Sequence, residues 1–167
     1  MTDGHQDLIG ELLKLSFSDG VEQAAERYSE TDFHLAVLHR THDFWDDRGE
    51  ERYAAADREI EAVRQPLVVA LTARWGTPVP VDLTAYLRPE DPTPPEPFER
   101  LSQVSGEVLV WRPPGTDRWV GLAVGQADNE FPVELIAVVG VAPLPAASGP
   151  DATVSGREKT GRPVVAP

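Results

Sequence analysis

The hydrophobic pattern changes from a helical period to alternation at Gly76, and this change most constrains what the chain can fold into. Before Gly76, apolar residues recur at helical spacing across residues 52–75. After Gly76, apolar and polar residues alternate over 79–87, which is typical of a strand. The helical stripe consists of Tyr53, Ala56, Ile60, Val63, Leu67, Ala70 and Leu71, and the alternating positions are Val79, Val81, Leu83, Ala85 and Leu87. The sequence therefore predicts an α+β fold.

Proline and glycine mark the ends of these segments. Gly76 followed by Pro78 predicts the end of the helix. Pro66 lacks an amide hydrogen and crowds the carbonyl four residues before it, so it should kink the helix or begin a second one. Pro78 and Pro80 should confine the following strand to a sheet edge.

Three further helices are expected before residue 50. Apolar spacing predicts short helices over 6–16 and 20–28. Residues 32–46 fit both patterns, because Phe33, Leu35 and Val37 alternate as in a strand, while the spacing from Phe33 to Phe44 also suits one helical face. We favour a helix there, since residues 29–32 supply capping oxygens and no turn signal precedes Gly49.

The second half of the chain predicts a small antiparallel sheet. After a proline-rich loop over 88–104, with one helical turn near Phe98 to Leu101, strands are expected at 107–112, 118–125 and 131–142. The expected architecture has N-terminal helices packed on three or four antiparallel strands. Residues 1–142 form a single domain in this prediction, and 143–167, rich in Gly, Pro, Ala and Ser, form a flexible tail.

The register of the hairpin determines where two tryptophans point. If Arg112 faces Arg118, Trp111 lies near Trp119 on one face. Leu109, Gly121 and Ala123 share that face, and Val108, Val110, Val120, Leu122 and Val124 form the other. The aliphatic face should pack against the helices. The tryptophan face then either receives a partner's side chain or strand, or is itself covered and forms core.

Composition excludes several functions. The chain has no cysteine, which excludes disulfides, thiolate nucleophiles, iron–sulfur clusters and cysteine-ligated zinc. A net charge of −13 opposes nucleic-acid phosphates and anionic membrane surfaces. No signal peptide and no membrane-spanning apolar segment is predicted, so a soluble, cytoplasmic protein is expected. No standard catalytic signature occurs.

A cluster of histidines and aspartates offers a candidate metal site. If residues 32–46 are helical, His39, His42, Asp43 and Asp46 fall within one arc of the helix. Two imidazoles and two carboxylates could hold zinc or another divalent ion, provided that a further ligand came from elsewhere. The same residues also form ordinary pairs four positions apart on a solvated helix face, which is the interpretation that we favour.

The acidic run from Asp43 to Glu61 offers a different candidate, a docking surface for a basic protein. Asp43, Asp46, Asp47, Glu50 and Glu51 would steer the partner, and Trp111 and Trp119 would anchor it. In acidity, size and arginine-biased composition the chain resembles small bacterial interaction proteins, including immunity proteins of toxin systems, although no motif carries this resemblance. The sequence thus favours a non-catalytic protein-binding module without a cofactor. The alternative is a metal-binding protein or metal-dependent enzyme that uses His39, His42, Asp43 and Asp46.

Overall fold

The computed structural model describes residues 2–17, 22–24, 26–84, 96–141 and 143–144. The predicted strand residues 85–87, part of the predicted loop over 88–104 and nearly all of the predicted tail lie outside these ranges. In the part of the chain that the structure describes, no helix has the length and apolar character needed to cross a membrane.

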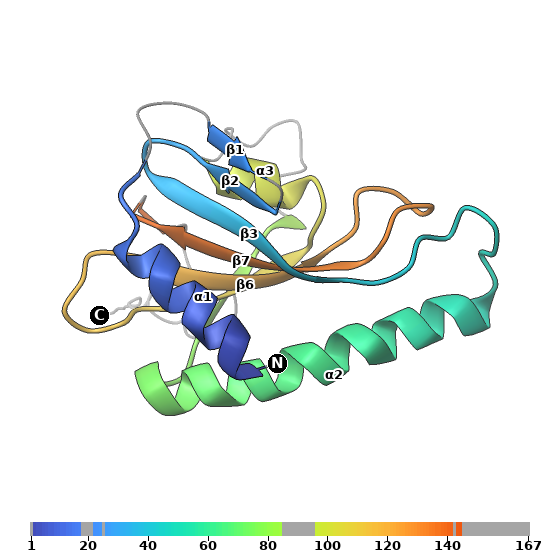
Figure 1. Ribbon diagram of the computed structural model, residues 1–167, viewed down its shortest axis with the longest axis horizontal. Coiled ribbons are helices and arrows are strands. Elements are labelled where there is room, and N and C mark those ends of the chain that lie inside the picture. Colours follow the sequence, from blue (N-terminus) through green and yellow to red (C-terminus); the bar gives the residue numbers. More distant parts are fainter. Residues whose placement is uncertain (1, 18–21, 25, 85–95, 142, 145–167) are drawn as a thin grey trace, which may run out of the picture.

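A single antiparallel sheet organises the described residues, which contain seven strands and three helices (Figure 1). The strands are β1 (Glu22–Ala24), β2 (Arg27–Ser29), β3 (Phe33–Arg40), β4 (Val79–Asp82), β5 (Glu107–Trp111), β6 (Trp119–Gly125) and β7 (Glu134–Gly140). The helices are α1 (Thr2–Lys14), α2 (Glu50–Trp75) and α3 (Phe98–Ser102). The strand order is β1-β2-β3-β7-β6-β5-β4. The α+β class is confirmed, whereas the sheet is larger and the helices are fewer than predicted.

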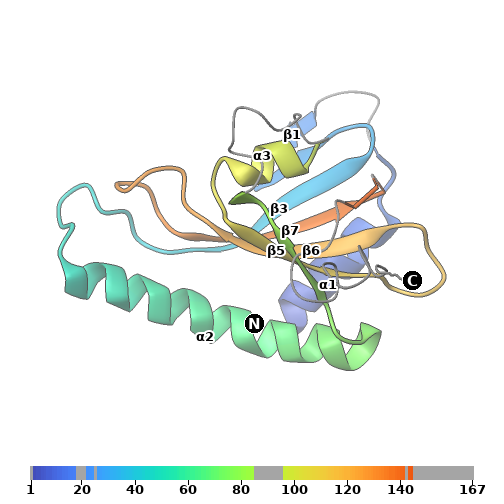
Figure 2. The same ribbon diagram turned by 180° about the vertical axis from the view of Figure 1, so that it is seen from behind.

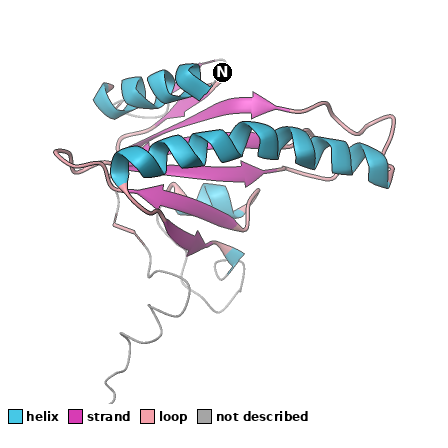
Figure 3. Ribbon diagram, turned by 90° about the horizontal axis from the view of Figure 1, so that it is seen from below, coloured by secondary structure: helices cyan, strands magenta, loops and turns pink. Residues whose placement is uncertain are grey.

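The sheet is covered on both faces. Helices α1 and α2 lie on one face and α3 lies on the other (Figures 2 and 3). Alternate residues of β7 divide between the two cores: Leu135, Ala137 and Val139 face α1 and α2, while Ile136 and Val138 face α3. Burial on both sides explains why β7 is an almost unbroken apolar run.

The first three strands correct two of the predicted helices. Residues 22–24 and 27–29 form β1 and β2 instead of a helix over 20–28, and residues 33–40 form β3 instead of a helix over 32–46. Strand β3 pairs with β7 along nearly its whole length, from Phe33 opposite Gly140 to Arg40 opposite Glu134. The polar residues before it belong to a turn, in which Glu30 N–H donates to Phe33 O at 2.9 Å. Ser, Thr and Asp favour turns as well as helix caps, and here the turn forms.

Helix α2 is one continuous element of 26 residues. Pro66 is exposed and does not divide it. The helix ends as predicted at Gly76, whose φ of +91° suits glycine and whose N–H donates to Thr72 O at 2.8 Å. Strand β4 follows and lies at an edge of the sheet, as its prolines predicted. The helical turn expected near Phe98 is α3.

The predicted hairpin register is wrong by one residue. Trp111 pairs with Val120, so Trp111 and Trp119 point to opposite faces. Trp111 packs under α2, where its Nε1 donates to Thr72 Oγ1 at 3.4 Å, and Trp119 stacks on Phe98 of α3 with ring centroids 5.2 Å apart. Each tryptophan is 1% exposed. Both are therefore core residues, and neither is available to anchor a partner.

Candidate docking surface

Neither the alternative metal site nor the favoured set of His/Asp pairs on a solvated helix face forms, because the helix on which both depended is absent. His39 belongs to β3, while His42, Asp43 and Asp46 lie in the connection from β3 to α2. His39 Nε2 donates to Glu59 Oε2 at 2.6 Å, and the ring of His42 lies edge-on to Phe44. Over the residues that the structure describes, no three or more His, Asp or Glu side chains come together as metal ligands would.

The five predicted acidic residues do lie at one end of the molecule. Asp43, Asp46 and Asp47 belong to the connection between β3 and α2, and Glu50 and Glu51 form the first turn of α2. All five are exposed. Glutamates are favourable at this position because the amino end of a helix carries partial positive charge. In Figures 1 and 3 this end of α2 runs past the ends of the strands, alongside the connections 41–49 and 126–133.

Hydrogen bonds fasten the two connections to each other. Thr41 N–H donates to Val133 O at 2.9 Å, and Val133 N–H donates to Thr41 Oγ1 at 3.0 Å. Phe44 N–H donates to Glu130 O at 2.9 Å, while Arg48 pairs with the Glu130 carboxylate at 2.6 Å. These hydrogen bonds and this ion pair hold the two connections together at the projecting end of the molecule.

Phe44 ties this projection to α2. Its side chain is fully buried and stacks on Tyr53 of α2 with ring centroids 4.2 Å apart. The Tyr53 hydroxyl in turn donates to Asn129 O at 2.8 Å, in the second connection. The neighbouring residue, Trp45, is by contrast left largely in solvent.

Trp45 and Phe131 form an exposed aromatic pair at the projecting end. Trp45 is 57% exposed and Phe131 is 41% exposed. Their rings meet edge to face with centroids 5.5 Å apart, although they come from different connections. We call Trp45, Phe131 and the exposed acids Asp43, Asp46, Asp47, Glu50 and Glu51 the tip surface. Sequence reasoning missed both aromatics, because Phe44 and Trp45 share the same acidic surroundings and only one of them is exposed.

A separate group of titratable residues lies where α1 meets the sheet. His5 Nε2 donates to Leu38 O at 3.1 Å. Burial lowers the pKa of His5, and the nearby His39 lowers it further, against the raising effect of the bond to Leu38. Because the neutral imidazole is favoured here, these contacts fit a structural role in holding α1 to β3.

Comparisons of the chain with models of protein families, with curated proteins and with solved structures each found no match. Inference about function therefore depends on the residues and geometry of this chain.

Proposed function

We propose that the protein is a small, acidic, non-catalytic binding module that docks a basic protein partner through the tip surface. The observation that carries the proposal is the exposed Trp45–Phe131 pair at the same projecting end as five exposed carboxylates. The composition favours a role in neutralising such a partner, as immunity proteins do. A reducing compartment such as the cytoplasm suits a chain without cysteine.

The aromatic pair would supply most of the binding energy. Trp is enriched among the few residues that dominate binding at protein interfaces, and aromatic residues in general are enriched there. The two rings already contact each other, and they belong to connections that are hydrogen-bonded together. Their side chains should therefore lose little conformational entropy when a partner binds.

The carboxylates would supply orientation and speed. A net charge of −13 attracts a basic protein over long range, and the acids of the tip surface direct the encounter to one end of the molecule. Rim charges of this kind mainly change the association rate and its dependence on salt. The aromatic contact should then determine how slowly the complex dissociates.

Site-specific photo-crosslinking tests this proposal. A photoreactive phenylalanine analogue replaces the exposed Asp46 of the tip surface in one sample and Val69 in the other, since Val69 is 58% exposed on α2 but lies outside the tip surface. We expect one predominant basic protein to be crosslinked from position 46 and not from position 69, with the aromatic pair left intact in both samples. Its purified form should then associate with the unlabelled chain at a rate that falls as salt is raised. Equal capture from both positions, or an association rate indifferent to salt, would overturn the proposal.

A further inference from the structure

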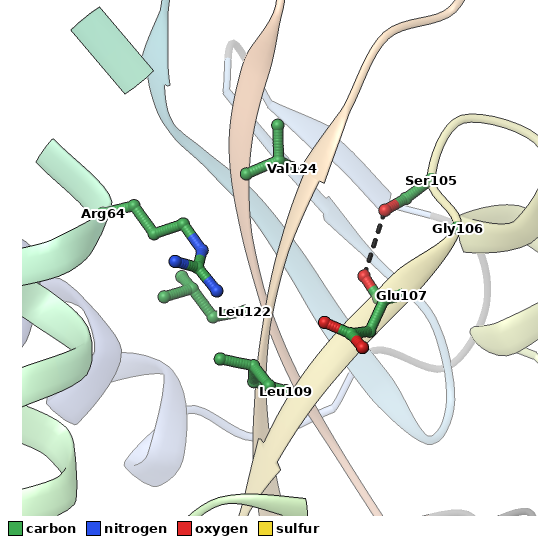
Figure 4. A pocket seen from close by; sticks show the side chains of 7 residues that line it. All are labelled: Arg64, Ser105, Gly106, Glu107, Leu109, Leu122 and Val124. Carbon is green, nitrogen blue, oxygen red and sulfur yellow. Dashed lines mark hydrogen bonds between the residues drawn. The ribbon is translucent and has the colours of Figure 1, made fainter. Parts of the chain in front are cut away.

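A cavity of about 330 Å³ lies between α2 and the sheet, away from the tip surface. Its volume is at the lower end of the range for small-molecule sites, which is roughly 300–1,000 Å³. Figure 4 shows its lining: Arg64, Ser105, Gly106, Glu107, Leu109, Leu122 and Val124.

The floor of the cavity is aliphatic. Leu109 of β5 and Leu122 of β6 are paired across the two strands and point to the face covered by α2, and Val124 continues the same face. Leu122 is almost fully buried, while Leu109 and Val124 stay partly exposed. Covering this floor with an apolar group would remove further hydrocarbon surface from water.

Opposite charges flank the floor. The guanidinium of Arg64 reaches from α2 toward Leu122, and the carboxylate of Glu107 lies on the side of the cavity formed by β5 (Figure 4). Arg64 Nη1 contacts Glu61 Oε2 at 3.2 Å, but among the described contacts no ion pair joins Arg64 to Glu107. Ser105 Oγ donates to the backbone oxygen of Glu107 at 3.1 Å, and among the described residues no hydrogen bond or ion pair engages the Glu107 carboxylate.

We propose that this cavity binds a small dipolar molecule of the amino-acid class. Arg64 would bind its carboxylate, Glu107 would bind its ammonium group, and the leucine floor would cover its aliphatic part. An arginine presents several N–H donors in a fork that matches a carboxylate. A ligand with only a carboxylate would meet Glu107 and a protein of net charge −13, and a ligand with only an amine would meet Arg64. A molecule with both charges satisfies both residues.

Titration by nuclear magnetic resonance tests the inference on the full chain. The probes are leucine and 6-aminohexanoate, which differ in the separation of their two charges. We expect saturable shifts from at least one probe, confined to amides of Arg64, 105–109 and 122–124. Hexanoate and hexylamine, each with one charge, should bind at least about tenfold more weakly than the better probe, because each leaves one charged residue without its partner. Absence of saturable shifts from both probes, or equal binding of the single-charge analogues, would overturn the inference.

Two variants connect the binding to the charged pair. Arg64→Gln and Glu107→Gln should each weaken binding of the better probe by about tenfold or more. Arg58→Gln and Asp57→Asn remove exposed charges of the same kinds from α2 outside the cavity and should leave binding unchanged. Amide spectra of each variant without ligand show whether it is folded. Undiminished binding in folded Arg64→Gln and Glu107→Gln would refute the assignment. A Trp45→Ala variant should retain binding, which separates this site from the proposed docking function.

Discussion

Replacing Arg118 with alanine should loosen α1 from the body of the protein. The guanidinium Nη1 of Arg118 lies 2.9, 3.1 and 2.6 Å from the carbonyl oxygens of Leu12, Leu13 and Leu15. It also lies over the ring of Phe17, with Cζ 4.0 Å from the ring centroid. The last carbonyl groups of a helix have no hydrogen-bond donors within the helix. Arg118, about a hundred residues later in the chain, donates hydrogen bonds to two of these carbonyls in α1.

The size of the effect follows from these contacts. One nitrogen carries two hydrogens, so the three distances represent at most two full hydrogen bonds. Bonds to a charged donor contribute about 1.5–3 kcal/mol each when well buried, and less for this partly exposed side chain. The helix-terminus charge and the ring contact add about 0.5–1 kcal/mol each at most. We expect Arg118→Ala to lower the free energy of unfolding by about 2–3 kcal/mol, a large part of the stability of a domain.

Urea unfolding followed by tryptophan fluorescence measures this loss. Arg112→Ala is the matched control, because Arg112 belongs to the same hairpin but is exposed. In Arg118→Ala, amide hydrogen exchange should quicken first in α1, since this helix loses one of its attachments while the strands of the sheet stay paired. The reasoning is refuted if the free energies of unfolding of Arg118→Ala and Arg112→Ala differ by no more than about 0.5 kcal/mol, which is the usual range for surface substitutions.

Three further predictions concern pH, packing and metal. Stability should fall as pH drops below the ordinary pKa of 6.5, because the unfolded chain protonates His5 before the folded chain does; His5→Gln should flatten this part of the pH profile of the urea midpoint. Gly140→Ala places a Cβ 2.9 Å from Trp119 Cζ2 and should cost about 1–3 kcal/mol in the same assay, whereas Gly10→Ala meets nothing within 4 Å and should not destabilise. Zinc should change the melting temperatures of the wild type and of His42→Ala by the same amount. A larger rise in the wild type would contradict the observed separation of the candidate ligands.

Local signals predicted the helix α2, its end and the elements that follow. The apolar stripe of α2 is long enough to be read without tertiary information, and Gly76 marks its end by a backbone angle that glycine adopts easily. Pro80 indicated an edge strand because it cannot donate to a neighbour. The α+β class could therefore be predicted from the sequence.

The identity of β3 and the hairpin register could not be predicted in the same way. Strand β3 pairs with the three-residue β2 just before it and, along nearly its whole length, with β7 about a hundred residues later. Most of the pairing that decides between strand and helix is therefore absent from the local sequence. In the hairpin, a shift of one residue exchanges the two faces, and Trp111 and Trp119 are apolar enough for either. The contacts of Arg118 with α1 accompany the observed register, and nothing in the hairpin sequence indicates them.

The acidic part of the candidate site could be predicted, and its aromatic part could not. Runs of charged residues stay in solvent whatever the fold, so the exposure of Asp46 and Glu50 was foreseeable. Phe44 and Trp45 are neighbours of similar character, and only the packing of Phe44 on Tyr53 decides which of them is left outside. Phe131 joins Trp45 across two connections, which no sequence spacing indicates.

The affinity of the purified, crosslink-identified partner for three variants tests the docking surface most directly. Trp45→Ala and Phe131→Ala should each raise the dissociation constant by at least about tenfold, mainly through faster dissociation, as expected for truncating anchor residues. Val69→Ala removes an apolar side chain about as exposed as Trp45 from α2, outside the tip surface, and should leave the constant unchanged. If all three variants bind as tightly as the wild type, the tip surface does not dock this partner.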